Sequence, residues 1–235
     1  MERTALRRAR RADLVVTSSG MQTDGTHNGF KEYLGDHGIS SMVVENRPYV
    51  QRDVQKTVKN NGWTVAYLGR VREFESFHWL IKAIELIPVD QRPDLKIAGD
   101  GVAADAVHKL LLTEANRLGI HLHLSAAFEV NDLPELMADV DVMYAMYEPQ
   151  RGNIMQGALP VKMFDAASFG VPTVVNSDCL MGEICNSEAL GMPATWGNAE
   201  SISAALLSLR STIVEPTDRG LDQQKAMIAA VESLL

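Results

Sequence analysis

Short apolar stretches alternate with longer amphipathic segments from residue 63 onward, and this order limits the fold more than any other feature of the chain. The amphipathic segments have helical spacing and end at helix-stopping residues such as Pro88, Gly119 and Gly170. The apolar stretches have the length of strands and cover 63–68, 95–98, 121–124, 140–144 and 173–176. Such alternation predicts an α/β, Rossmann-like fold in which helices cover both faces of a parallel sheet.

The predicted helices complete this pattern. They cover 76–87, 103–118, 133–138, 160–168, 181–185, 199–210 and 222–235. The first sixty residues differ, because a basic helix is followed by a strand in 12–19, a short helix in 29–38 and a strand in 41–46. We expect these residues to form a short N-terminal α/β remnant beside the main sheet.

Composition narrows the class of protein. Hydrophobic residues make up 46% of the 235 residues, which allows a sizeable core. The formal charge of −8 argues against nonspecific nucleic-acid binding. Two cysteines, Cys179 and Cys185, make no disulfide framework, and with no signal peptide visible we expect a cytoplasmic protein. The arginines in residues 3–11 are either a solvated helix face or a peripheral contact with anionic lipid at the inner face of the membrane.

Glycines and polar residues follow several predicted strands, at the edge where ligands of parallel sheets bind. Gly69 and Arg70 end the first of these strands; glycine allows close approach of a ligand, and the arginine fork suits phosphate oxygens. Gly99, Asp100 and Gly101 end the second strand in a tight turn. This edge is therefore the expected binding site.

A predicted helix also brings charged residues to this edge of the sheet. Lys162 and Asp165 lie three positions apart in a predicted helix, so they share one face. They are either an ordinary surface ion pair or a pair that meets a polar ligand. No metal site is predicted, because His121 and His123 share a strand face without a third ligand.

Taken in order, the segments 63–70, 95–101 and 159–176 resemble the C-terminal, donor-binding half of GT-B glycosyltransferases. The closest likeness is to the large retaining family that uses nucleotide-sugar donors, and it runs from about Ala12 to the C-terminus. The resemblance implies transfer of a sugar, hexosyltransferase type, from a UDP- or GDP-sugar to an acceptor. That donor is a substrate, and neither a cofactor nor a divalent metal is implied.

The resemblance also assigns roles to residues. It implies that Arg70 contacts the donor diphosphate and that Arg70 and Lys162 are the catalytic cations. Donor-binding residues would be Gly69, Arg70, Gly99, Asp100, Gly101, Phe128, Glu148 and Asp165. Of these, Asp165 would hold the ribose hydroxyls. Phe128 either stacks on the base or is a plain core residue.

Two departures from the family pattern are visible. Glu75 stands where the family has a lysine, and a carboxylate there would repel a diphosphate unless Arg72 or Lys162 compensates. The first of two family glutamates falls on Gly157, with Glu148 further upstream as the acid that would swing in. Arg151 and Asn153, in the loop between them, are further candidates for contact with the sugar.

These observations leave alternatives open. We expect 1–60 to resemble the end of a GT-B N-terminal domain and linker, 61–215 to bind the nucleotide sugar, and 216–235 to form a C-terminal helix. A companion subunit carrying the acceptor domain, or a homo-oligomer, would complete the short N-terminal part. The second hypothesis is a noncatalytic partner or scaffold. A weaker third is an NAD-dependent oxidoreductase, suggested by the G-x-G-x-x-A pattern of 99–104.

Overall fold

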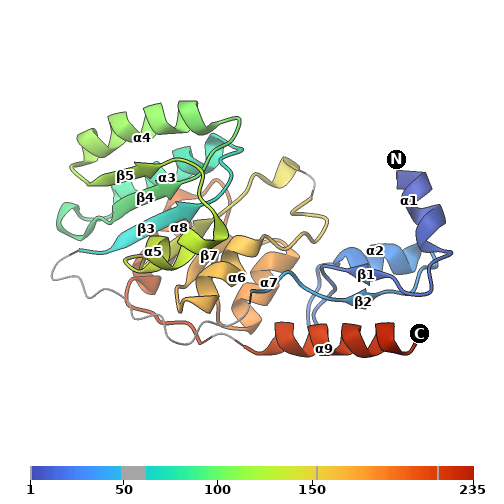
Figure 1. The fold of residues 1–235 in the computed structure, drawn as a ribbon. Helices are drawn as coiled ribbons and strands as arrows, with labels where there is room; N and C mark the ends of the chain where they lie inside the picture. Colours follow the sequence, from blue (N-terminus) through green and yellow to red (C-terminus); the bar gives the residue numbers. More distant parts are fainter. Residues whose placement is uncertain (1, 49–61, 152, 216) are drawn as a thin grey trace.

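The computed structural model describes residues 2–48, 62–151, 153–215 and 217–235. Its main feature is a parallel sheet with the strand order β5-β4-β3-β6-β7-β8 (Figure 1). The strands are β3 (Thr64–Leu68), β4 (Asp94–Ala98), β5 (Leu122–Ser125), β6 (Val142–Ala145), β7 (Thr173–Asn176) and β8 (Gly191–Ala194). The predicted α/β fold with a parallel sheet is therefore confirmed.

Helices cover both faces of this sheet. They are α3 (Glu75–Leu86), α4 (Ala104–Leu118), α5 (Leu133–Met137), α6 (Val161–Ser168), α7 (Leu180–Ser187) and α8 (Ala199–Leu209). Because side chains alternate along a strand, Val65 and Tyr67 belong to the core formed with α3, α4 and α8, whereas Ala66 and Leu68 belong to the core formed with α5 and α6. Both faces are thus buried, as expected for parallel strands.

The order of the strands reverses between β3 and β6. From β3 the chain adds strands outward to β4 and β5, and then returns to add β6, β7 and β8 on the other side. The connections on either side of this point leave in opposite directions, which opens a crevice at the carboxyl ends of β3 and β6. This crevice is where the candidate site lies.

One strand of the sheet is not predicted from the sequence. β8 pairs with β7 at the edge of the sheet, with Val175 opposite Pro193. Gly191 and Pro193 interrupt the apolar pattern that marks the other strands. Proline is tolerated here because an edge strand needs no second ladder of hydrogen bonds.

A smaller unit lies beside the main sheet. It contains α1 (Glu2–Ala9), β1 (Val16–Thr17), α2 (Phe30–Asp36) and β2 (Met42–Val43). The two strands pair in parallel, which bears out an N-terminal α/β remnant, although each is much shorter than predicted. We call residues 2–46 the N-terminal unit. The helix α9 (Arg219–Glu232) runs along this unit (Figure 1), and Gln223 Oε1 accepts a hydrogen bond from the Glu45 N–H at 2.8 Å.

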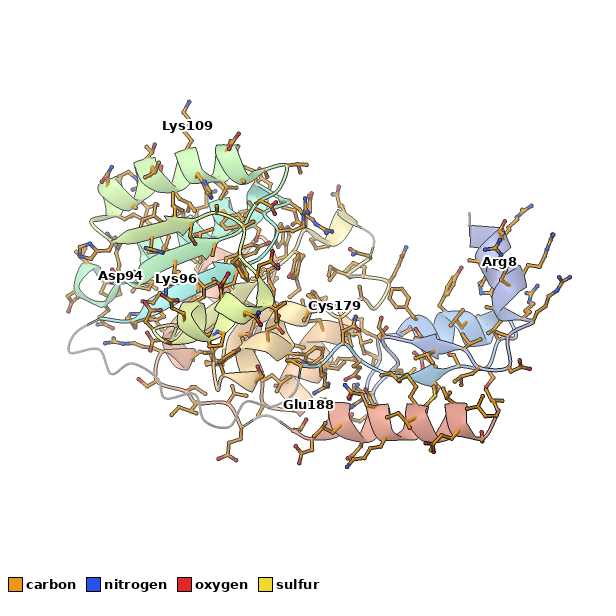
Figure 2. The ribbon with its side chains drawn as sticks, viewed as in Figure 1. Arg8, Asp94, Lys96, Lys109, Cys179 and Glu188 are labelled. Atoms are coloured by element: carbon orange, nitrogen blue, oxygen red, sulfur yellow. The ribbon has the colours of Figure 1, made fainter. Side chains whose placement is uncertain are left out.

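Charged side chains hold these parts together. Arg47 lies between two carboxylates, with Nε 2.6 Å from Glu45 Oε2 and Nη1 2.6 Å from Glu188 Oε2. Arg219, at the start of α9, reaches the same two carboxylates at 3.2 and 3.1 Å. Figure 2 labels Glu188 close to this end of α9. We call Glu45, Arg47, Glu188 and Arg219 the buried charge cluster; it joins the N-terminal unit, the end of α7 and α9.

Among the described residues, no helix combines the length and the apolar character needed to cross a membrane.

Candidate functional site

A cavity of about 420 Å³ opens at the carboxyl ends of β3 and β6, where the strand order reverses. We call it the edge cavity. Its walls come from the turn after β3, from α5, from the loop after β6 and from the first turn of α6. The polar and aromatic residues that line it are Arg70, Arg72, Phe128, Tyr147, Asn153, Lys162 and Asp165. Three cations and one carboxylate therefore face a single space.

The turn after β3 is held in a strained shape. Gly69 has a φ of +122°, a conformation that side chains disfavour, and a Cβ there would lie 2.8 Å from Lys162 Nζ. The Tyr67 hydroxyl donates a hydrogen bond to the Arg70 carbonyl oxygen at 2.7 Å, which fixes the turn. The Arg70 side chain is 62% exposed, and its Nε lies 4.0 Å from Asp100 Oδ1. The guanidinium is therefore available to a ligand.

Lys162 is the most unusual cation of the site. Its Nζ lies 4.7 Å from the centroid of the Tyr67 ring and 6.0 Å from that of Tyr147. Burial, together with repulsion from Arg72, lowers the pKa of Lys162 to about 8, against the attraction of Asp165 and Glu73. An amine in such a place gains strongly from an anion that enters the cavity.

Asp165 lines the same cavity as Lys162, as their shared helix face allows. Burial raises the pKa of Asp165 to about 6, although Lys162 opposes the shift. The two groups are thus both partly desolvated and opposite in charge. Perturbed pairs of this kind in a cleft mark candidate functional sites.

Some predicted residues support the cavity without lining it. Gly99 and Gly101 have φ values of +143° and +144°, and a Cβ on either would collide with the carbonyl oxygens of Gly69 and Val71 respectively. The turn after β4 therefore packs directly on the turn after β3. Together with Asp100 these glycines shape the edge of the sheet, while the cavity wall itself is made by other residues.

Glu75, which stands where the family has a lysine, and Glu148, which was expected to bind the donor, are both off the cavity wall. Glu75 is the first residue of α3 and is exposed to solvent. Glu148 is held in its loop by its backbone N–H, which donates to Glu73 Oε2 at 2.7 Å. Arg72 does line the cavity. The charge reversed at position 75 is therefore outside the site, and a cation three residues earlier is inside it.

Position 157 needs a glycine for a structural reason. Gly157 has a φ of +88°, and a Cβ there would collide with the Asn28 carbonyl oxygen and lie 2.6 Å from Gly29 Cα. A glutamate cannot occupy this position while the N-terminal unit is packed against it. Of the loop residues proposed to contact a sugar, Asn153 lines the cavity, and the side chain of Arg151 lies outside what the structure describes.

Sequence reasoning missed several lining residues. Tyr147 and Ile154 come from an irregular loop whose path has no sequence signal, and Arg72 was considered only as a substitute for a missing lysine. Also missed was the contact between the N-terminal unit and α7, where Glu183 accepts hydrogen bonds from Thr26 and His27. A separation of more than 150 residues leaves no local pattern for such a contact.

Solved structures with the same fold are numerous. HepE from Anabaena, in complex with UDP-glucose, has a TM-score of 0.68 at 18% identity, over 99% of this chain and 66% of that one. Sucrose-phosphate synthase from Thermosynechococcus elongatus has a TM-score of 0.66 at 14% identity, over 98% and 59%. The lipopolysaccharide outer core galactosyltransferase WaaB has a TM-score of 0.61 at 17% identity, over 96% and 63%. This chain thus spans just under two thirds of the HepE chain, and a comparison with curated proteins finds no match.

These likenesses confirm the expected fold, the C-terminal half of a GT-B enzyme. A family model described as "Glycosyl transferases group 1" matches residues 62–212, which is more than half of the chain and includes every strand of the main sheet. The family match and the fold therefore agree. The edge cavity lies where the strand order reverses, inside the matched residues. The chain belongs to the glycosyl transferases group 1 family.

Proposed function

We propose that the edge cavity binds a nucleoside-diphosphate sugar and that the chain provides the donor-binding half of a retaining hexosyltransferase. The observation that carries this proposal is the group of three cations, Arg70, Arg72 and Lys162, around a cavity at the reversal point of the sheet. A diphosphate offers these cations several oxygens at once, and charge-assisted hydrogen bonds are the strongest available to it.

Each residue then has a role in the proposal. Arg70 and Lys162 hold the diphosphate and stabilise the negative charge that grows on it as the bond to the sugar breaks. Asp165 accepts hydrogen bonds from the ribose hydroxyls. Phe128, on the cavity wall, offers an aromatic face to the base. Gly69 leaves room for the diphosphate beside Lys162.

The nucleotide is proposed to be UDP first and GDP second, because the HepE structure was solved with UDP-glucose. Isothermal titration with UDP, GDP, UDP-glucose and GDP-mannose tests this directly. We expect one of the diphosphates to bind at one site per chain and to raise the unfolding temperature. A ligand at 100 times its dissociation constant adds about 2.7 kcal/mol of stability. Failure of all four ligands to bind would overturn the proposal.

A second candidate function is a noncatalytic or companion-dependent glycosyltransferase subunit. The small N-terminal unit favours it, since in the described residues β1 and β2 pair only with each other. A two-stranded sheet is marginally stable by itself, so packing against another element would stabilise it. In this reading residues 1–60 and 216–235 are the part that meets a companion, which would carry the acceptor domain or be a second copy of the chain. Residues 61–215 bind the donor in either case.

A further inference from the structure

The loop after β6 begins with a residue whose backbone is held from two sides. The Tyr147 N–H donates to Asn176 Oδ1 at 2.8 Å, and Asn176 Nδ2 donates back to the Tyr147 carbonyl oxygen at 2.8 Å. The next N–H, that of Glu148, donates to Glu73 Oε2 at 2.7 Å. Asn176 is the last residue of β7, and Glu73 lies in the turn between β3 and α3. Since β3 and β7 are the two neighbours of β6 in the sheet, side chains from both sides fix the same stretch of backbone.

The carbonyl group just before Tyr147 is bonded in the same way. Ser76 Oγ, in the first turn of α3, donates to the Met146 carbonyl oxygen at 2.8 Å. With the bonds to Asn176 and Glu73, both peptide units that flank Tyr147 have their N–H and C=O bonded by side chains. Backbone polar groups away from water need such partners. The position of this backbone can therefore be changed by substituting one side chain.

The chemistry of Asn176 matches what Tyr147 presents. An amide side chain has one acceptor and one donor group, and the Tyr147 backbone offers it one N–H and one C=O. An aspartate of the same shape would still accept from the N–H, but it would place a second oxygen against the C=O. Asn176 is 3% exposed, so water cannot readily replace a lost bond. The contact therefore distinguishes two side chains of nearly equal size.

The residue held in this way forms part of the edge cavity. Tyr147 lines the cavity, and its ring centroid lies 6.0 Å from Lys162 Nζ, while the Tyr67 ring lies 4.7 Å from the same atom. Aromatic faces attract a cation and take the place of water around it. Asn153 and Ile154, which also line the cavity, follow on the same loop. The placement of the Tyr147 backbone therefore decides how Lys162 is surrounded.

Glu73 adds a charge to this arrangement. Burial lowers the pKa of Lys162, and so does repulsion from Arg72, whereas Asp165 and Glu73 raise it. The carboxylate that bonds the loop therefore also favours the protonated amine. A glutamine at position 73 keeps an oxygen acceptor for the Glu148 N–H but has no charge, so one substitution separates the two effects.

We propose that Glu73 and Asn176 are positioning residues of the edge cavity, which act by holding Tyr147 beside Lys162. Neither residue lines the cavity, so each acts through the backbone of the loop and not by touching a ligand. The consequence for diphosphate binding rests on the proposed function, because it requires the anion to lie beside Lys162. The placement of the loop and the charge of Lys162 can both be measured without a ligand.

Hydrogen exchange of the amides at 147 and 148, measured on the whole chain, tests the placement of the loop. We expect Asn176→Asp and Glu73→Ala to speed this exchange roughly tenfold, and Glu73→Gln, which keeps the acceptor, to stay close to the wild type. Asn198→Asp is the matched control, because Asn198 Oδ1 accepts from the Ser201 N–H at the start of α8 and an aspartate keeps that bond. Wild-type exchange in both Asn176→Asp and Glu73→Ala would overturn the proposal.

A pH titration of the Lys162 amine, followed by NMR with isotope-labelled lysine and assigned with Lys162→Arg, tests the role of the charge. We expect the midpoint to lie at lower pH in Glu73→Gln than in the wild type. Glu75→Gln removes the same charge two residues away, off the cavity wall, and should leave the midpoint unchanged. Equal midpoints in all three proteins would refute this role of Glu73.

The UDP dissociation constant, measured over the same pH range, links the inference to the proposed function. Its pH dependence should shift to lower pH in Glu73→Gln and not in Glu75→Gln. If UDP fails to bind while the exchange and titration results hold, the donor proposal falls and the positioning of Lys162 stands. If UDP binds with a pH dependence that Glu73→Gln does not move, the donor proposal stands and the positioning role of Glu73 falls.

Discussion

Lys162 keeps a positive charge in a place that water reaches poorly, and this makes its ligand binding sensitive to pH. The pKa of the free side chain is lowered to about 8, and a diphosphate binds the protonated form better. Above pH 8 binding must therefore be coupled to proton uptake. We expect the UDP dissociation constant to be nearly flat up to about pH 7, to have roughly doubled at about pH 8, and then to rise by up to tenfold per pH unit, as measured by isothermal titration.

The control for this effect is Lys162→Arg. A guanidinium stays charged throughout this range, so its UDP affinity should be independent of pH, whatever its absolute value. A wild-type affinity that stays constant up to pH 9.5 would contradict the assignment of Lys162 to the diphosphate.

Arg70 and Glu75 form an informative pair of substitutions. Arg70 lines the edge cavity, so Arg70→Ala should weaken UDP binding by about 1.5–3 kcal/mol, the range for a hydrogen bond to a charged group. Glu75 is exposed and off the cavity wall, so Glu75→Lys should tighten UDP binding only slightly, and only at low salt. Titrations at two salt concentrations check both. A large gain from Glu75→Lys would mean that the ligand extends along the start of α3.

Asp165 can be tested against the ligand itself. If its carboxylate accepts hydrogen bonds from the ribose, Asp165→Asn should weaken UDP binding, and should matter less for 2′-deoxy-UDP, which lacks one of the hydroxyls. The double-mutant cycle formed by the two proteins and two ligands isolates this contact. Additive effects, with no coupling between the residue and the 2′-hydroxyl, would move the ribose away from Asp165.

At the scale of elements, the packing of α9 in the buried charge cluster depends on Arg47, which neutralises both carboxylates. Removing Arg47 leaves the fully buried carboxylate of Glu45 and the nearly buried Glu188 with Arg219 alone. We expect Arg47→Met to lower the free energy of unfolding by about 3–5 kcal/mol in urea titrations. Arg117, which bridges Glu85 and Glu114 on the surface, gives the matched control, and Arg117→Met should cost much less stability because solvent screens these charges. Similar losses in the two variants would show that burial of the cluster contributes little.

The elements also show how far local sequence patterns extend. The five strands bounded by clear apolar stretches and the helices between them were predictable, because each buries a face with a regular period. β8 was not, since Gly191 and Pro193 break that period. β1 and β2 are two residues long, so the apolar runs of 12–19 and 41–46 predict strands that are too long. In the described residues β1 and β2 pair only with each other, so no further strand extends their pairing.

The residues of the candidate site also fall into those that local sequence patterns predict and those that they do not. Gly69, Arg70, Lys162 and Asp165 were predictable as cavity residues, because they sit at fixed distances from a strand end or share a helix face. Asn153 was suggested by its loop alone. The contact between Gly157 and Asn28 was not predictable, because these residues are far apart in sequence and only the folded backbone brings them together.

At the scale of the whole molecule, we predict that the purified chain binds nucleotide without turnover. β1 and β2 form a two-stranded sheet in the described residues, too small to clamp an acceptor against the donor. With UDP-glucose and a panel of glycosides, released UDP should stay at the background rate until a companion chain is added. Robust transfer by the isolated monomer would contradict this expectation.

The buried charge cluster also sets an order of events during synthesis. Glu45 and Arg219 are 174 residues apart, and at roughly 5–20 residues per second the ribosome needs about 9–35 s to add the second after the first. During that interval the carboxylate of Glu45 has no arginine from α9, and the side of the N-terminal unit that α9 will cover remains open. The N-terminal unit is therefore made and can fold well before the helix that packs along it exists, and the charge cluster is completed only when α9 has been synthesised.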